Sequence, residues 1–225
     1  MFFDSTFIIL IPAILISMYA QQKVQNTFAK YSQAYSQSSY TGYDIAQRIL
    51  ANNGLHHVKI EQSKGHLTDH YDPRTQVLRL SQSVYGSRSI AAYGVAAHEV
   101  GHAIQHANRY VPLEFRNLMV PVVSFSSKVV WVLVLLGLFL GFAGLFQVGI
   151  ILFSAIVLFQ LVTLPVEFNA SNRAIMELEG LDLLQNEELG QAKKVLDAAA
   201  LTYVAAALTA LSQLFRLIML SGRRR

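Results

Sequence analysis

A run of 38 residues without a charged side chain, between Lys128 and Glu167, limits how this chain can fold more than any other feature. At about 1.5 Å per residue, a helix of that length measures roughly 57 Å, close to two crossings of a hydrocarbon core about 30 Å thick. Glycines around 144–149 offer a turn near its middle. The run predicts a transmembrane helical hairpin, residues 118–166, with arms at 120–143 and 147–166.

Two further apolar stretches indicate additional membrane helices. Residues 1–20 lack a basic segment and a small-residue cleavage site, so they predict an N-terminal transmembrane anchor rather than a signal peptide. Residues 198–225 comprise an alanine-rich helix and a basic tail. This helix would either span the membrane or pack against the other spans as an amphipathic helix, and we favour the membrane span. Only 14% of residues are charged, against about a quarter in soluble domains. The sequence therefore predicts an α-rich multi-pass membrane protein.

The distribution of Lys and Arg predicts the orientation of these helices. Residues 21–117 contain ten of them, and no Lys or Arg precedes the first span. By the positive-inside rule this segment faces the cytoplasm, and so does 167–197 after the hairpin returns. A full C-terminal span would place Arg223, Arg224 and Arg225 outside, against the same rule. We expect a plasma-membrane protein with residues 21–117 and 167–197 on its cytoplasmic side.

The cytoplasmic segment 21–117 predicts a small α+β domain. We expect a polar linker over 21–40, a helix to about residue 53 that begins with a Thr41–Asp44 capping box, and a helix over 88–108. Short strands are expected at 57–61, 66–71 and 76–80, the last two joined by a turn at 72–75. Such a domain has a small core, which packing against membrane helices would complete.

The expected helix over 88–108 carries a pattern typical of zinc hydrolases. His98 and His102 are four residues apart and lie on one helical face, so that both imidazoles can bind one Zn²⁺. Glu99 can then act as general base toward a metal-bound water. The alternative is a buried helix whose polar residues serve structure, but a buried His-Glu-His set needs partners, and a metal supplies them.

A catalytic zinc needs a third protein ligand, and the chain has no cysteine to provide one. Glu167 is the first charge after the uncharged run, and we expect it to begin a helix. Spacing alone supports equally a ligand and an interfacial helix cap after Pro165. His106 shares the face of His98 and His102, but a third imidazole one turn further along a straight helix fits a tetrahedral site poorly.

The chain resembles the YugP-like family of bacterial membrane neutral zinc metallopeptidases almost from end to end. The resemblance is carried by 67–73 (LTDHYDP), 95–106 (VAAHEVGHAIQH), 164–171 (LPVEFNAS) and 198–206 (AAALTYVAA). It implies a zinc peptidase of the bacterial plasma membrane. The chain is more distantly similar to the HtpX-like membrane peptidases, and that similarity implies Glu167 as third ligand and a zincin-like domain. Ser171 departs from their pattern, which has Asp there, so Asn169, Asn172 or Asp69 would have to support the ligand histidine.

The residues and the resemblance together predict a gluzincin-type zinc endopeptidase that acts on membrane or membrane-associated proteins. His98, His102 and Glu167 would hold Zn²⁺ and Glu99 would be the base. Tyr203 and His70 are candidate donors to the tetrahedral intermediate, although packing explains Tyr203 as well. The strand at 76–80 is expected to receive substrate by strand addition.

Two other functions compete with this prediction. A non-catalytic membrane adaptor or chaperone-like protein with a structural zinc would have no use for Glu99. A transporter would place ionisable groups within its spans, which the hairpin lacks. A stripe of basic and aromatic residues is missing from the sequence, which disfavours nucleic acid as a partner. The expected partners are a protein or peptide substrate and the lipid bilayer. The glycines Gly137, Gly141 and Gly144 would let helices approach closely either within one chain or between two copies in a homo-oligomer.

Overall fold

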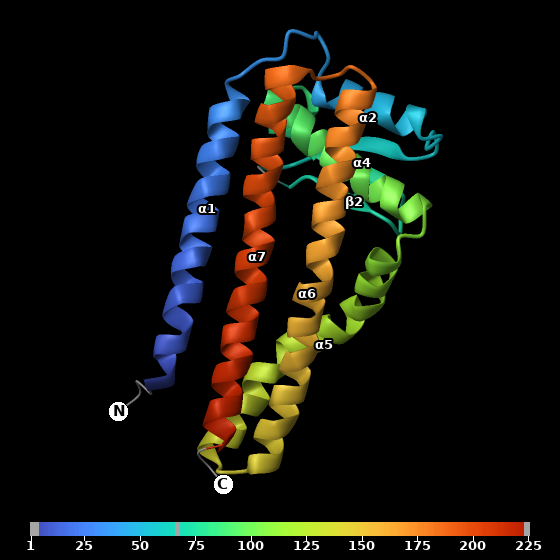
Figure 1. Ribbon diagram of the computed structural model, residues 1–225. Helices are drawn as coiled ribbons and strands as arrows, with labels where there is room; N and C mark the ends of the chain where they lie inside the picture. The colour runs from blue at the N-terminus through green and yellow to red at the C-terminus, as the bar shows by residue number, and fades with distance from the viewer. Residues whose placement is uncertain (1–4, 66–67, 223–225) are drawn as a thin grey trace. The chain divides into compact units, whose positions relative to one another are not determined.

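A computed structural model describes residues 5–65 and 68–222 as a predominantly helical chain with one small sheet (Figure 1). A 3₁₀ turn, Ser5–Ile9, precedes the other elements, which are α1 (Leu10–Ser32), α2 (Gly42–Asn52), β1 (Lys59–Ser63), β2 (His70–Asp72), β3 (Val77–Ser81), α3 (Gln82–Tyr85), α4 (Ile90–Ala107), α5 (Val111–Phe139), α6 (Ala143–Gly180) and α7 (Asn186–Gly222). The expected mostly helical architecture is confirmed.

Within the described residues, four helical segments are long and apolar enough to cross a membrane. They are Ser5–Ser32, Val111–Phe139, Ala143–Gly180 and Asn186–Gly222. Large apolar side chains lie exposed on them, among them Leu118, Phe139 and Ile151. A helix satisfies its own backbone hydrogen bonds and can present such side chains to lipid. These four candidate spans agree with the prediction of a multi-pass membrane protein.

The chain divides into two compact units. The hairpin unit comprises residues 1–21, 114–165 and 201–225, and the sheet unit comprises 22–113 and 166–200. The predicted domain boundaries stay a prediction. The basic tail at 223–225 lies outside the described residues.

In the hairpin unit, α5 and α6 approach closely at glycines. A Cβ on Gly137 would lie 2.7 Å from the backbone nitrogen of Phe146, and one on Gly149 would lie 2.7 Å from Val134 Cγ2. The turn expected at 144–149 was placed wrongly, because α6 already begins at Ala143. The chain reverses just before it, where Gly141 adopts φ 68°, a left-handed conformation that suits glycine.

The sheet unit contains a mixed three-stranded sheet in the order β1-β3-β2. β3 pairs parallel with β1, Lys59 to Val77, and antiparallel with β2, Tyr71 to Leu78. The expectation that 76–80 receives substrate by strand addition is wrong, because β3 is the central strand and both of its edges are paired. The free edges belong to β1 and β2.

The core of the sheet unit lies between the sheet and its helices. Leu78 and Leu80 of β3 are fully buried in one cluster with Ile45 and Ile49 of α2 and with Tyr93 of α4. This cluster anchors α4, which carries the His98–His102 pair, to the sheet.

Some predicted boundaries of the sheet unit agree with the structure and others differ. The Thr41–Asp44 capping box is confirmed: the Asp44 amide donates to Thr41 Oγ1 at 3.3 Å, and the Thr41 amide donates to Asp44 Oδ2 at 2.8 Å. The polar linker predicted over 21–40 is wrong in its first half, because α1 continues to Ser32. The first strand begins two residues later than expected. Residues 66–67 of the strand predicted at 66–71 lie outside the described residues.

We predict that Gly137→Val lowers the stability of the protein by about 1–3 kcal/mol, because the new side chain must displace the backbone of Phe146. Gly144→Val is the matched control in the same hairpin, since the atoms nearest to its Cβ belong to the Phe142 ring, at 3.5 Å or more. Thermal unfolding of the detergent-purified variants measures the difference. Equal unfolding temperatures for the two would refute the close packing at Gly137.

Candidate metal centre

The two histidines lie on α4, a helix most of whose residues are buried. Ser89 caps its N-terminus by accepting a hydrogen bond from the Ala92 amide at 3.2 Å. Its small residues, such as Ala92, Ala96 and Ala103, are buried and let neighbouring elements approach closely. The His98 and His102 rings lie edge to face with their centroids 4.8 Å apart. The i, i+4 spacing therefore places both imidazoles side by side, as the sequence predicted.

Glu167 reaches both imidazoles from α6. Its Oε2 lies 3.3 Å from His98 Nε2 and 3.7 Å from His102 Nε2. The potential ligand atoms of the three residues all lie within 4.8 Å of one another. The expectation that Glu167 begins a helix is wrong, since α6 runs without interruption from Ala143 to Gly180 through Pro165. Because Glu167 lies inside this helix, it does not cap a helix N-terminus.

The three side chains fit a zinc ion by their chemistry. Glu167 is only 3% exposed, and a buried carboxylate requires positive charge and hydrogen-bond donors close by. Burial by itself would lower the pKa of His102, but the carboxylates of Glu167 and Glu99 outweigh it and raise that pKa above its usual value. Two imidazole nitrogens and one carboxylate oxygen form a donor set that suits zinc and leaves a position open for water.

A glycine inside the histidine motif lets α6 approach α4. A Cβ on Gly101 would lie 2.6 Å from the carbonyl oxygen of Ala170, closer than any real contact. Ala170 lies three residues after Glu167 on the same helix and is fully buried. The absence of a side chain at Gly101 therefore sets the helix separation at which the Glu167 carboxylate can face the two histidines.

Gln105 determines which nitrogen of His102 faces Glu167. Its amide Nε2 donates to the Val166 carbonyl at 2.8 Å and to Asn169 Oδ1 at 2.9 Å. Because these acceptors fix the amide orientation, Oε1 faces His102 Nδ1 at 3.0 Å, and that nitrogen must carry the hydrogen. His102 Nε2 then keeps its lone pair for a metal. Sequence reasoning missed Gln105, although its i+3 spacing from His102 marks it as a neighbour on the same helix face.

Ser171 performs the equivalent task for His98. Its Oγ lies 3.1 Å from His98 Nδ1, so the hydroxyl can accept the Nδ1 hydrogen while Nε2 faces Glu167. Of the three substitutes considered from the sequence, Asn169 supports His102 through Gln105, and Asp69 instead accepts hydrogen bonds from Ser81. Burial raises the pKa of Asp69 above its usual value, although the hydrogen bonds from Ser81 act to lower it. Asn172 is exposed.

The proposed base, Glu99, is held by the edge strand β2. The Tyr71 amide donates to Glu99 Oε2 at 3.1 Å, and the Glu99 side chain is largely buried. The Tyr71 hydroxyl lies 2.9 Å from His106 Nδ1. Burial, with a smaller effect of the Asp72 charge, raises the pKa of Tyr71 to about 12, so its phenol stays protonated at neutral pH. Tyr71 therefore connects β2 to two residues of α4.

The other predicted site residues are His106, His70 and Tyr203. The Nδ1 atom of His106 is hydrogen-bonded to the Tyr71 hydroxyl. Among the described residues, the group that could hold a metal ion does not include His106. His70 is exposed on β2, with its Nδ1 2.8 Å from the Thr68 carbonyl. Tyr203 lies on the part of α7 that belongs to the hairpin unit. The roles of His70 and Tyr203 as donors stay predictions.

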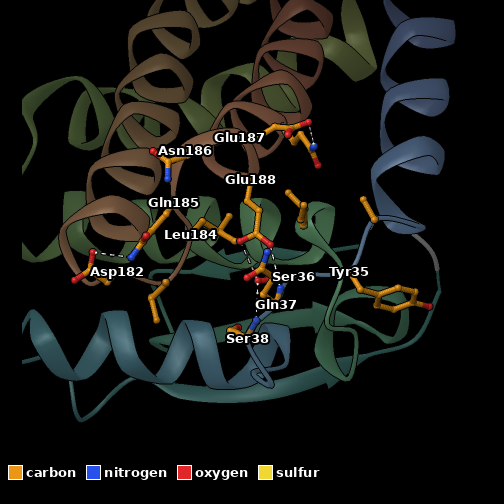
Figure 2. Close-up of a pocket in the computed structure, with 14 residues that line it drawn as sticks. Tyr35, Ser36, Gln37, Ser38, Asp182, Leu184, Gln185, Asn186, Glu187 and Glu188 are labelled. Carbon is orange, nitrogen blue, oxygen red and sulfur yellow. Dashed lines mark hydrogen bonds between the residues drawn. The ribbon is translucent and has the colours of Figure 1, made fainter.

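A polar cavity of about 660 Å³ also lies in the sheet unit, and its described lining residues include none of the three potential ligands. Figure 2 shows Glu188 of α7 pointing toward Ser36 and Gln37. Its carboxylate accepts hydrogen bonds from Ser36 Oγ at 3.2 Å and from the Gln37 amide at 3.0 Å. This carboxylate therefore fastens the segment after α1 to the beginning of α7.

Comparison with known proteins agrees with a membrane metallopeptidase. The sequence profile of the family described as "Putative neutral zinc metallopeptidase" matches residues 6–222. The chain belongs to this family. It is 52% identical over 215 residues, 95% of the chain and 96% of the relative, to the protein named "Putative membrane protease YugP" of Bacillus subtilis strain 168. No solved structure matches the chain.

We predict that Gly101→Ala weakens zinc binding and lowers the stability of the protein by about 1–3 kcal/mol, because the added methyl group pushes α6 away from α4. Gly190→Ala is the matched control, a helical glycine with nothing within 4 Å of the position that its new methyl group would occupy. Zinc content after dialysis and thermal unfolding measure the two effects. Wild-type zinc content in Gly101→Ala would show that the helix separation does not set the site.

We also predict that Gln105→Leu lowers zinc affinity about tenfold to a hundredfold, the usual effect of losing a partner that orients a ligand histidine. The leucine has a similar volume but leaves the His102 Nδ1 hydrogen and the Val166 carbonyl without their present partner. Competition with a chromogenic chelator measures the affinity. Gln47→Leu, at an exposed position of α2, is the control and should bind zinc as the wild type does; an equal affinity for both variants contradicts the assignment.

Proposed function

We propose that the chain is a membrane-anchored zinc endopeptidase of the gluzincin type. The observation that carries the proposal is the convergence of His98 Nε2, His102 Nε2 and Glu167 Oε2 from two helices, beside a glutamate that follows the first histidine. Zinc bound there would act as a Lewis acid that polarises a peptide carbonyl and makes a water molecule more acidic. The family and the relative named above support the same class of activity.

Glu99 would transfer protons in this reaction. Its carboxylate is one residue from His98 and is oriented through Oε2 by the Tyr71 amide. Placed in this way, it would take a proton from the attacking water and deliver it to the leaving amine. Gln105 and Ser171 would keep both imidazoles in the tautomer that turns Nε2 toward Glu167.

The edge of β2 is the proposed position of the substrate backbone. An amide that donates to Glu99 cannot also donate to β3, so the Tyr71 amide lies on the free edge of β2. An extended peptide that pairs with this edge would run beside Glu99. His70, the neighbouring residue of β2, stays our candidate donor to the tetrahedral intermediate, and Tyr203 is a second.

The cellular setting of the reaction is also part of the proposal. The excess of Lys and Arg in residues 21–117 supports a cytoplasmic active site. A site on that side and close to the bilayer would suit membrane or membrane-associated proteins as substrates.

Zinc content and proteolysis of three variants test the proposal. We expect Glu167→Ala to lose bound zinc because the buried carboxylate is gone. Glu99→Gln should retain zinc and lose chelator-sensitive cleavage of fluorescent casein by at least a hundredfold, since an amide cannot act as a base. Glu179→Ala removes an exposed carboxylate of the same helix and should change neither property.

The outcomes separate the parts of the proposal. Full zinc content in Glu167→Ala would mean that the third ligand lies elsewhere. Full cleavage by Glu99→Gln would remove Glu99 as the base. A wild type that holds zinc but shows no chelator-sensitive cleavage of casein would favour the adaptor with a structural zinc.

A further inference from the structure

A basic pocket lies between α1 and α7 within the sheet unit. Its volume is about 370 Å³, and its lining residues are Lys23, Asn26, Thr27, Lys30 and Tyr31 of α1 with Lys194 and Asp197 of α7. The five residues of α1 follow the i, i+3, i+4, i+7, i+8 pattern of a single helical face, and the two of α7 are three residues apart. The pocket is thus formed by two helix faces that turn toward each other.

Fixed contacts hold these two faces together. Tyr31 is only 7% exposed and packs in one buried cluster with Val195 of α7 and Ala91 of α4. The hydrogen bonds from Ser36 and Gln37 to Glu188 fasten the chain after α1 to α7. The pocket is therefore a built feature of the fold rather than a chance gap between mobile side chains.

The pocket offers the chemistry that an anionic phosphate requires. Its three lysines outnumber its single carboxylate, Asp197, so it carries an excess of positive charge. Lys30 lies near the Tyr31 ring, with its Nζ 5.3 Å from the centroid. The side chains of Asn26 and Thr27 add neutral donors. Ammonium groups together with neutral donors are typical partners of phosphate oxygens.

The position of the pocket along its helices indicates where that phosphate comes from. Lys23 follows the apolar stretch of α1 that ends at Ala20, and Lys194 precedes the apolar stretch of α7 that begins at Ala198. At about 1.5 Å per residue, Lys23 and Lys194 lie within roughly 6 Å of these apolar stretches. This is the level of lipid headgroups when those stretches are in the bilayer.

We propose that this pocket binds the phosphate headgroup of an anionic phospholipid. Basic pockets at the ends of membrane helices are suited to such headgroups. The bound lipid would bridge α1 and α7 through the lysines of both. The proposal goes beyond the peptidase function and does not depend on it, because none of the pocket residues belongs to the metal centre.

Native mass spectrometry of the detergent-purified full chain tests this proposal. The probes are phosphatidylglycerol and phosphatidylcholine with the same acyl chains. We expect the wild type to retain phosphatidylglycerol and Lys30→Gln/Lys194→Gln to bind it about thirtyfold more weakly, since each lysine contributes roughly fivefold. Lys64→Gln/Lys193→Gln removes two exposed lysines outside the pocket and should bind phosphatidylglycerol as the wild type does.

Three results would overturn the proposal. The first is that both double variants bind phosphatidylglycerol equally weakly. The second is that the wild type retains phosphatidylcholine as well as phosphatidylglycerol. The third is that millimolar inorganic phosphate displaces phosphatidylglycerol, which would identify a site for free phosphate. Lys30→Arg/Lys194→Arg should keep binding and shows that charge is required. Zinc content, measured on the same samples, should be equal in all variants, so failure of the lipid site is distinguished from failure of the metal centre.

Discussion

The candidate metal centre depends on one close approach between two helices. Gly101 allows the backbone of α6 to pass so near α4 that a methyl group would collide with the Ala170 carbonyl. At this separation Glu167 Oε2 faces both histidines, and Gln105 can donate to the Val166 carbonyl. Ser171 meets His98 across the same contact. A helix spacing wider by even a fraction of an ångström would loosen all these contacts together.

Those parts of the site that follow from local periodicity could be predicted from the sequence. The i, i+4 spacing placed His98 and His102 on one face, and the capping box located the start of α2. The spacing predicted Glu167 either as a metal ligand or as a helix cap, because spacing cannot show which helix will approach α4. The structure brings it to the histidines, and that contact depends on Gly101, a residue whose importance lies in having no side chain.

The features that the sequence did not reveal depend on contacts between distant segments. Val77–Ser81 reads as a strand from its residues, but its central position follows from pairing with both β1 and β2. Gln105 is an ordinary helical glutamine until the Val166 carbonyl, from another helix, fixes its amide. The glycines Gly144 and Gly149 predicted the turn of the hairpin. In the structure, Gly149 packs against Val134, and the chain reverses direction at Gly141. Composition cannot distinguish these uses of glycine.

The order of the three potential ligands along the chain has a consequence for biosynthesis. The histidines of α4 precede α5, and Glu167 follows it, so the carboxylate is made only after the first arm of the hairpin and most of the apolar part of the second. A nascent chain that ends before α6 holds two imidazoles and no carboxylate, and two donors retain zinc far more weakly than three. The order of synthesis thus delays a complete set of the three potential ligands until the hairpin exists.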